Sequence, residues 1–127
     1  MKNSLSLLLG SFLLLASLSS LADTCPRLQD FNYVQPPKGW SFLIGPDFIE
    51  TYTFSAAIHF LGALYHEQVV CRYEACSSSF CPAFTLISDK AYQEPSEPKA
   101  PWNHYSVLGH SLTCMPADHD PAHCIFQ

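Results

Sequence analysis

The chain has 127 residues, of which 48% are hydrophobic and 13% aromatic, so it can build the core of a small domain and is not a disordered protein. Its net charge is −5 at pH 7, and its few Lys and Arg residues form no cluster. This balance argues against nucleic acid and anionic membrane surfaces as partners.

Residues 1–22 have the pattern of a secretory signal peptide. Lys2 supplies a positive charge, residues 5–15 are mostly apolar, and Ser20 and Ala22 are small residues at the positions that a signal peptidase reads. The apolar stretch is too short to favour a membrane-spanning helix. The sequence therefore predicts a cleaved signal peptide and a single mature domain over residues 23–127, with no stable membrane anchor. We expect this domain in the periplasm or outside the cell.

All six cysteines lie in the mature part, and an even number of cysteines in a small exported chain is typical of a disulfide framework. Each disulfide stabilises a domain by roughly 2–4 kcal/mol, which is comparable with the total stability of a small one. Sequence alone does not select one pairing. We expect two short loops to be closed and the N-terminal arm to be tied to a central strand, which gives the pairs Cys25–Cys71, Cys76–Cys81 and Cys114–Cys124.

The first part of the mature chain contains two predicted strands. Residues 31–34 carry aromatic and β-branched side chains, and residues 40–44 follow a Pro-Pro-Lys-Gly turn. Gly45 and Pro46 end the second segment. Trp40 at its start has two interpretations, a ligand platform or a core side chain, and the core is the commoner place for a lone Trp at a strand start.

The central part has the clearest strand patterns. Side chains alternate in residues 69–74, and residues 83–87 follow the same pattern. Residues 53–65 fit a strand or a helix, because a short apolar run matches both periods. We favour a strand that pairs with residues 69–74 as an antiparallel hairpin, with a bulge at Gly62.

The C-terminal part is less regular. Residues 90–101 form a proline-bearing loop, whereas residues 102–108 and 111–114 are short strand candidates. We expect a disulfide to pin the irregular tail, with Ile125 and Phe126 packed on the sheet. Together these segments predict a mainly β fold: a small antiparallel β-sheet domain stapled by disulfides.

The tail also contains the sharpest candidate for a functional site. The candidate residues Asp118, His119, Asp120, His123 and Cys124 lie close together in the sequence, and imidazoles with carboxylates are common ligands of zinc or copper. The two histidines would share one face of a helix, but Pro121 between them disfavours a regular helix. A solvated polar tail is the other interpretation, since so short a pattern often matches by chance. A metal-binding protein or hydrolase that uses His119 and His123 is therefore the second hypothesis.

The chain has no complete catalytic motif. His66 and Glu67 match the start of a zinc-protease motif, but Val70 occupies the position of the second histidine. The sequence has neither a G-x-S-x-G motif nor a phosphate-binding glycine loop. Cys71 and Cys124 have histidines near them in sequence, but we expect both cysteines to be in disulfides rather than to act as nucleophiles. The sequence therefore predicts a protein that is not an enzyme and has no cofactor.

Several short motifs resemble those of one protein family. They are Cys25-Pro26, Gly39-Trp40, Phe60-Leu61-Gly62-Ala63, Val70-Cys71-Arg72-Tyr73 and Cys124-Ile125-Phe126. This pattern resembles a family of small exported proteins of Gram-negative bacteria that share a domain of unknown function. Some members are associated with secretion or intracellular growth. The resemblance implies a β-rich, disulfide-stapled and non-enzymatic domain, and it supplies no catalytic residues.

The leading hypothesis is an exported binding or structural protein that has a protein partner and no chemistry of its own. We expect the contact surface at an exposed sheet face or edge around residues 69–87, or at the proline-bearing loop. The physical reason is that an edge strand offers unpaired backbone groups to a partner.

Overall fold

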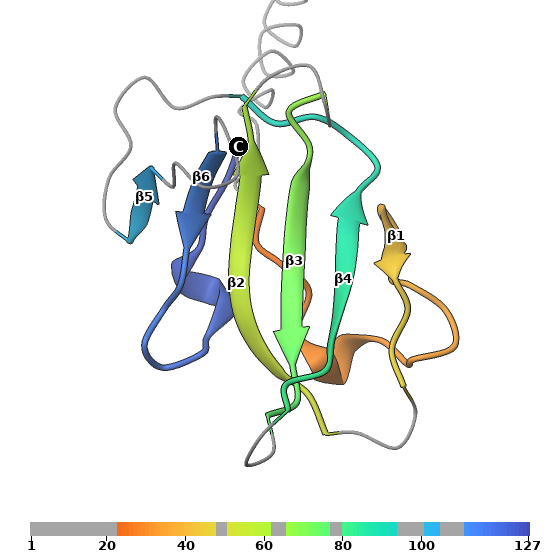
Figure 1. Ribbon diagram of the computed structural model, residues 1–127. Coiled ribbons are helices and arrows are strands. Elements are labelled where there is room, and N and C mark those ends of the chain that lie inside the picture. The colour runs from red at the N-terminus through yellow and green to blue at the C-terminus, as the bar shows by residue number, and fades with distance from the viewer. Residues whose placement is uncertain (1–22, 48–50, 62–65, 77–79, 94–100, 105–110) are drawn as a thin grey trace, which may run out of the picture.

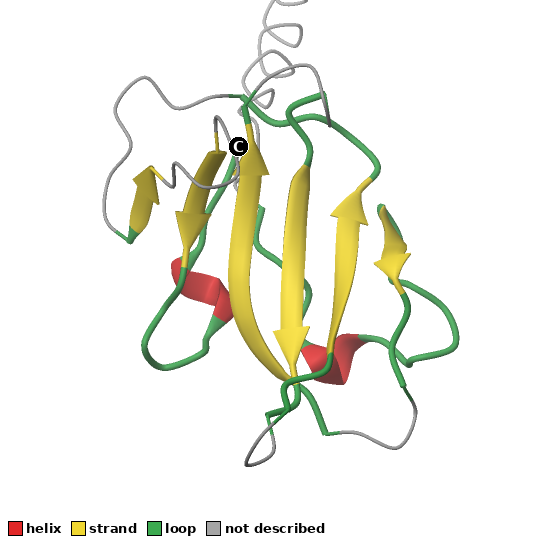
Figure 2. Cartoon of the chain, in the orientation of Figure 1, coloured by secondary structure: helices red, strands yellow, loops and turns green. Residues whose placement is uncertain are grey.

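The computed structural model describes residues 23–47, 51–61, 66–76, 80–93, 101–104 and 111–127 (Figure 1). Six strands of this part of the chain form one antiparallel sheet, accompanied by single turns of 3-10 helix at η1 (Leu28–Asp30) and η3 (Pro121–His123) (Figure 2). The strands are β1 (Trp40–Ile44), β2 (Thr53–Phe60), β3 (Val69–Glu74), β4 (Ala83–Ser88), β5 (Trp102–His104) and β6 (Ser111–Cys114). The predicted mainly β fold is confirmed, whereas the predicted signal peptide lies outside the described residues.

The strand order in the sheet is β1-β4-β3-β2-β6-β5. Strands β2 and β3 form an antiparallel hairpin, and β4 returns antiparallel to β3. Among the described strands the edges are β1 and β5, because β1 pairs only with β4 and β5 pairs only with β6. The two strands on which the sequence analysis placed an edge, β3 and β4, are therefore both internal.

Two local predictions differ from the structure. The segment that fitted either a helix or a strand is the strand β2, but its bulge lies between Phe54 and Ala56, and the predicted bulge position, Gly62, is outside the described residues. The predicted strand at 31–34 is wrong. There the side-chain oxygen of Asn32 accepts hydrogen bonds from the backbone N–H groups of Val34 and Gln35, both at 3.0 Å, and closes a turn instead.

The core lies on one face of the sheet and is mainly aromatic. Tyr73 stacks on Phe84 with ring centroids 4.7 Å apart, and Tyr52 meets the Phe84 ring edge-on at the same distance. Such pairs stabilise by about 0.5–1.5 kcal/mol beyond the burial of their area. The N-terminal arm (residues 23–39) and the C-terminal tail (residues 115–127) cover this face, behind the sheet in Figure 1. Burial raises the pKa of Tyr73, whose hydroxyl donates to the backbone oxygen of Pro26 in that arm.

Three disulfides join the same pairs that the sequence analysis expected, and no cysteine is free. Cys25–Cys71 fastens the N-terminal arm to β3, and Cys114–Cys124 fastens the tail to β6. Such a set of disulfides indicates an oxidising compartment outside the cytoplasm. Among the residues that the structure describes, none belongs to a helix with the length and hydropathy needed to cross a membrane.

The tail and the start of the described chain meet. Asp23 and Phe126 exchange two backbone hydrogen bonds of 2.8 and 2.9 Å. Phe126 is buried among aromatic side chains, as predicted, but Ile125 is exposed, so the expected packing of Ile125 on the sheet is wrong. A strand-like segment alternates its side chains, and only one of two neighbours can face the core.

The disulfides should contribute unequally to stability. Cys25–Cys71 spans 46 residues and Cys76–Cys81 spans 5, so loop-closure entropy predicts losses of about 4 and about 2 kcal/mol, respectively, when each pair is replaced by alanine. Urea unfolding of the two double variants measures both losses. Equal losses would contradict this account.

Candidate functional site

The polar cluster of the tail is shaped by a disulfide and two prolines. Cys114–Cys124 closes the loop, and the buried Pro116 and Pro121 fix backbone torsions within it. Pro121 takes the first position of η3, where a helix tolerates proline, and the side chain of Asp120 caps this turn by accepting from the N–H of Ala122 at 2.9 Å. The result is one 3-10 turn that begins only after Asp120.

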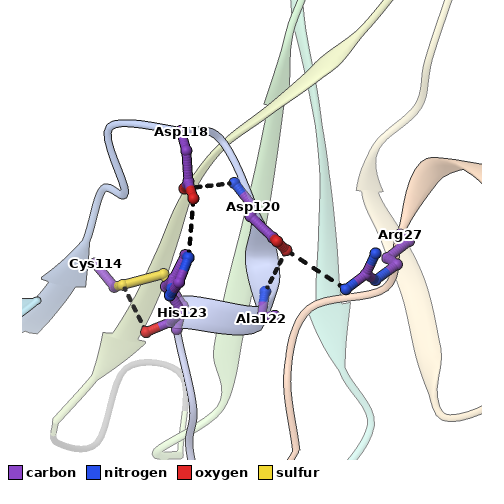
Figure 3. A network of polar contacts seen from close by, with 7 residues as sticks. Arg27, Cys114, Asp118, Asp120, Ala122 and His123 are labelled. Atoms are coloured by element: carbon purple, nitrogen blue, oxygen red, sulfur yellow. Dashed lines mark hydrogen bonds and ion pairs between the residues drawn. A yellow bond between two sulfur atoms is a disulfide. The ribbon is translucent and has the colours of Figure 1, made fainter.

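The loop brings two carboxylates and one imidazole together (Figure 3). Asp118 Oδ2 lies 2.9 Å from His123 Nε2, and Asp118 Oδ1 accepts the backbone N–H of Asp120 at 3.1 Å. One candidate ligand atom from each of Asp118, Asp120 and His123 lies within 4.8 Å of the other two. Arg27 approaches Asp120 from the N-terminal arm, with 3.6 Å between Nη2 and Oδ1. All of these side chains are exposed or half-exposed.

His119 does not belong to this group. Its Nδ1 lies 3.0 Å from the backbone oxygen of Phe54 in β2, so Nδ1–H donates to that carbonyl. Its φ of 59° lies in the left-handed region, and its ring contacts β2. Of the candidate cluster in the tail, the structure therefore groups Asp118, Asp120 and His123, and it leaves out His119. The Asp-x-Asp pattern before Pro121 is the sequence signal for this turn.

The local electrostatics favour a charged carboxylate at Asp118. The backbone N–H of Asp120 lowers the pKa of Asp118, and the neighbouring His123 lowers this pKa further. Asp118 is thus an ionised, metal-competent oxygen donor at neutral pH.

Two shallow hollows lie on the covered side of the sheet. One, of about 280 Å³, adjoins the polar cluster and is lined by Arg27, Phe54, Asp118 and His119, among others. The other, of about 260 Å³, is lined by Lys38, Trp40, Asp89, Lys90 and Tyr92, among others.

Trp40 combines the two roles that its sequence position left open. It is half-buried, packs edge-on to Phe126 with 6.2 Å between the ring centroids, and also lines the second hollow. Two side chains that line the second hollow contact Asp23: Tyr92 donates to its carboxylate at 2.8 Å, and Lys90 pairs with it at 3.2 Å. The carboxylate of Asp23 in this hollow is thus already paired.

The edge strand β1 is a candidate contact surface that the sequence analysis did not select. Its five residues carry no charge, and Leu43 and Ile44 have exposed fractions of 44% and 58%. The surface expected at residues 69–87 is less available, because β3 and β4 are internal and Val70 and Thr85 are buried on the face opposite the aromatic core. Most of the proline-bearing loop lies outside the described residues.

The two cysteines considered as nucleophiles, Cys71 and Cys124, are both in disulfides. No protein-family model, curated protein or solved structure matches this chain. The resemblance to exported bacterial proteins therefore stays a prediction, and function has to be inferred from the surfaces themselves.

The Asp118 carboxyl should titrate below the ordinary value of an aspartate, because the Asp120 N–H and His123 stabilise its charged form. The contact with His123 should persist at neutral pH and disappear as the pH falls through this lowered pKa. Side-chain NMR titration measures the midpoint. His123→Ala should raise it only partway, since the N–H of Asp120 remains, and a midpoint at or above the ordinary value would contradict the geometry.

Proposed function

We propose that this chain is an exported, non-enzymatic binding protein whose partner adds an extended strand to the sheet at β1. Export is supported by the signal-peptide pattern of residues 1–22 and by the three disulfides, which form in oxidising compartments.

The observation that carries the proposed docking mode is the composition of the β1 edge. An edge strand presents backbone N–H and C=O groups that a further strand can pair with, and most natural edges are protected by Lys, Pro or short length. The five residues of β1 include neither Lys nor Pro. Leu43 and Ile44 add exposed apolar side chains beside these backbone groups.

The other edge is better protected. Strand β5 has three residues, follows Pro101, and its Trp102 indole N–H donates to the backbone oxygen of Ile125 at 3.0 Å. A partner strand therefore has a longer template at β1 than at β5, and it would have to follow the register shift between Phe42 and Ile44.

The chemistry of β1 specifies what the partner segment should look like. In strand addition, backbone hydrogen bonds give affinity and alternate side chains give specificity. A matching segment is extended and places apolar side chains opposite Leu43 and Ile44. Removal of Lys2 with the signal peptide leaves five basic and eleven acidic residues, a net charge of −6, which favours a segment flanked by Lys or Arg.

Photo-cross-linking in the producing cells tests this docking mode. Benzoylphenylalanine in place of Leu43 should give a defined adduct with one partner. Adding Ile44→Lys should lower its yield by roughly tenfold or more, because a docked strand would bury an ammonium group without a counter-charge. Both positions are exposed, so the folded domain should tolerate the changes within about 0.5 kcal/mol.

The matched control places the same photoreactive residue at Val34, which is 79% exposed and lies in a turn outside the sheet. Equal adduct yields from positions 34 and 43 would argue against β1 as the docking edge. So would an adduct at position 43 whose yield does not change with Ile44→Lys.

The purified protein should have the mass of a chain that begins at Asp23 and contains three disulfides.

A second candidate function is the binding of a divalent metal at the tail. It is favoured by the grouping of the ligand atoms of Asp118, Asp120 and His123 within 4.8 Å. Two carboxylates and one imidazole are a ligand set that suits zinc, with the remaining coordination position left to solvent. The ring of His123 would exchange its hydrogen bond with Asp118 for a bond to the metal.

Calorimetric titration of the oxidised protein with zinc chloride tests this second candidate. His123→Ala and Asp118→Asn should each weaken binding by more than about tenfold, the scale seen when even a supporting residue of a metal site is lost. His119→Ala should leave the affinity unchanged, because His119 Nδ1 is directed at the carbonyl of Phe54. The metal-site proposal would be overturned if the unmodified protein did not bind zinc, or if His119→Ala weakened binding more than His123→Ala and Asp118→Asn.

A further inference from the structure

The three disulfides differ sharply in their access to solvent. Cys25, Cys71, Cys114 and Cys124 are each no more than 1% exposed and belong to the covered side of the sheet. Cys76 and Cys81 are both exposed. They flank the connection between β3 and β4, which lies at the lower end of the sheet in Figure 1. Only Cys76–Cys81, of the three, can be reached by a reagent in solution without opening the core.

The hairpin does not depend on this disulfide for its pairing. Strands β3 and β4 are in register from Val70 opposite Ile87 to Glu74 opposite Ala83. The ladder continues beyond them, since the N–H of Ala75 donates to the backbone oxygen of Pro82 at 2.9 Å. Opening Cys76–Cys81 would therefore leave β3 and β4 paired.

A carboxylate is held in place beside one of the two sulfurs. Arg72 Nε donates to Glu74 Oε1 at 2.7 Å, and the other oxygen, Oε2, lies 3.7 Å from the Sγ of Cys76. In the reduced protein the Cys76 thiol would donate its S–H to this oxygen. Because a hydrogen bond to the neutral thiol favours that form, Glu74 stabilises the reduced state at Cys76.

We propose that Cys76–Cys81 is a site of thiol–disulfide exchange whose co-substrate is a dithiol. In the first step a thiolate of the dithiol attacks the Sγ of Cys76, the Cys76–Cys81 bond breaks, and Cys81 leaves as a thiolate that takes up a proton. Cys81 is the better leaving group, because the carboxylate of Glu74 disfavours a thiolate at Cys76. Arg72 offsets the repulsion between that carboxylate and the incoming thiolate.

In the second step the other thiol of the dithiol attacks the mixed disulfide. Cys76 leaves as a thiolate and takes up a proton, and its S–H then donates to the carboxylate of Glu74. The dithiol becomes a disulfide. Two electrons pass from the dithiol to the protein, and the reverse sequence oxidises the tip again. Phe80, which is 69% exposed beside Cys81, offers an apolar contact to a protein that carries the dithiol.

Differential alkylation of the unmodified full-length mature protein tests this site. The oxidised protein is incubated with limiting dithiothreitol, quenched with iodoacetamide, and mapped by peptide mass spectrometry. Cys76 and Cys81 should be alkylated at least ten times faster than the other four cysteines, while the circular dichroism of the sheet stays unchanged. Comparable rates for all three disulfides, or reduction only with loss of the sheet signal, would overturn the proposal.

Two variants and a second reagent refine the test. Glu74→Gln should shift the equilibrium with a dithiothreitol redox buffer several-fold towards the disulfide, because the neutral amide is a weaker acceptor for the Cys76 thiol, and an unchanged equilibrium would remove Glu74 from the mechanism. Replacing Cys114 and Cys124 by serine should leave exchange at Cys76–Cys81 intact.

Reduced thioredoxin, used in place of dithiothreitol at equal thiol concentration, decides the source of the dithiol. A faster reaction with thioredoxin assigns the dithiol to a protein, and a slower reaction assigns it to a small molecule.

Discussion

The side chains of Cys71 and Tyr73 fasten the N-terminal arm to the middle of the sheet. Cys71 does so covalently through Cys25, and Tyr73 does so by stacking on Phe84 and donating to the carbonyl of Pro26. Residues 23–39 contribute a single 3-10 turn and no strand of the sheet, so the arm is positioned by these contacts and by the pairing of Asp23 with Phe126. A layer of irregular chain can cover an aromatic sheet face only if it is anchored at points, and two buried disulfides supply such anchors.

Local patterns in the sequence predict most of the strands, because alternation and turn residues act over a few positions. Residues 69–74 and 83–87 alternate, and the structure places strands there. The same local reasoning fails at 31–34, where strand-forming residues lie in a turn because the Asn32 side chain satisfies the backbone. It also cannot supply the strand order, since β1 pairs with β4, three strands further along the chain. The true edges of the sheet therefore emerge only from long-range pairing.

For the candidate sites too, local sequence predicts which residues are present, whereas the fold decides which of them meet. Proximity in sequence selects Asp118, His119, Asp120 and His123 alike, but backbone direction decides which of these side chains converge. A left-handed φ at His119 turns its ring towards β2, and the turn at Asp118 brings its carboxylate to His123 instead. For the disulfide Cys76–Cys81 the residues that meet were predicted correctly, but their exposure was not. Its pairing was expected from its short loop, but its exposure, the property that gives it chemistry, depends on where the tip lies relative to the core.

The backbone pairing between Asp23 and Phe126 has a consequence for the order of synthesis. The segment around Asp23 leaves the ribosome and enters any translocation channel long before Phe126 does. The covering layer of the core therefore stays incomplete until late in chain emergence, and contacts between such distant segments form slowly. Under the proposed export, a chain with this topology would remain unfolded during translocation, and it would complete its aromatic core only where both ends are present together and the cysteines can be oxidised.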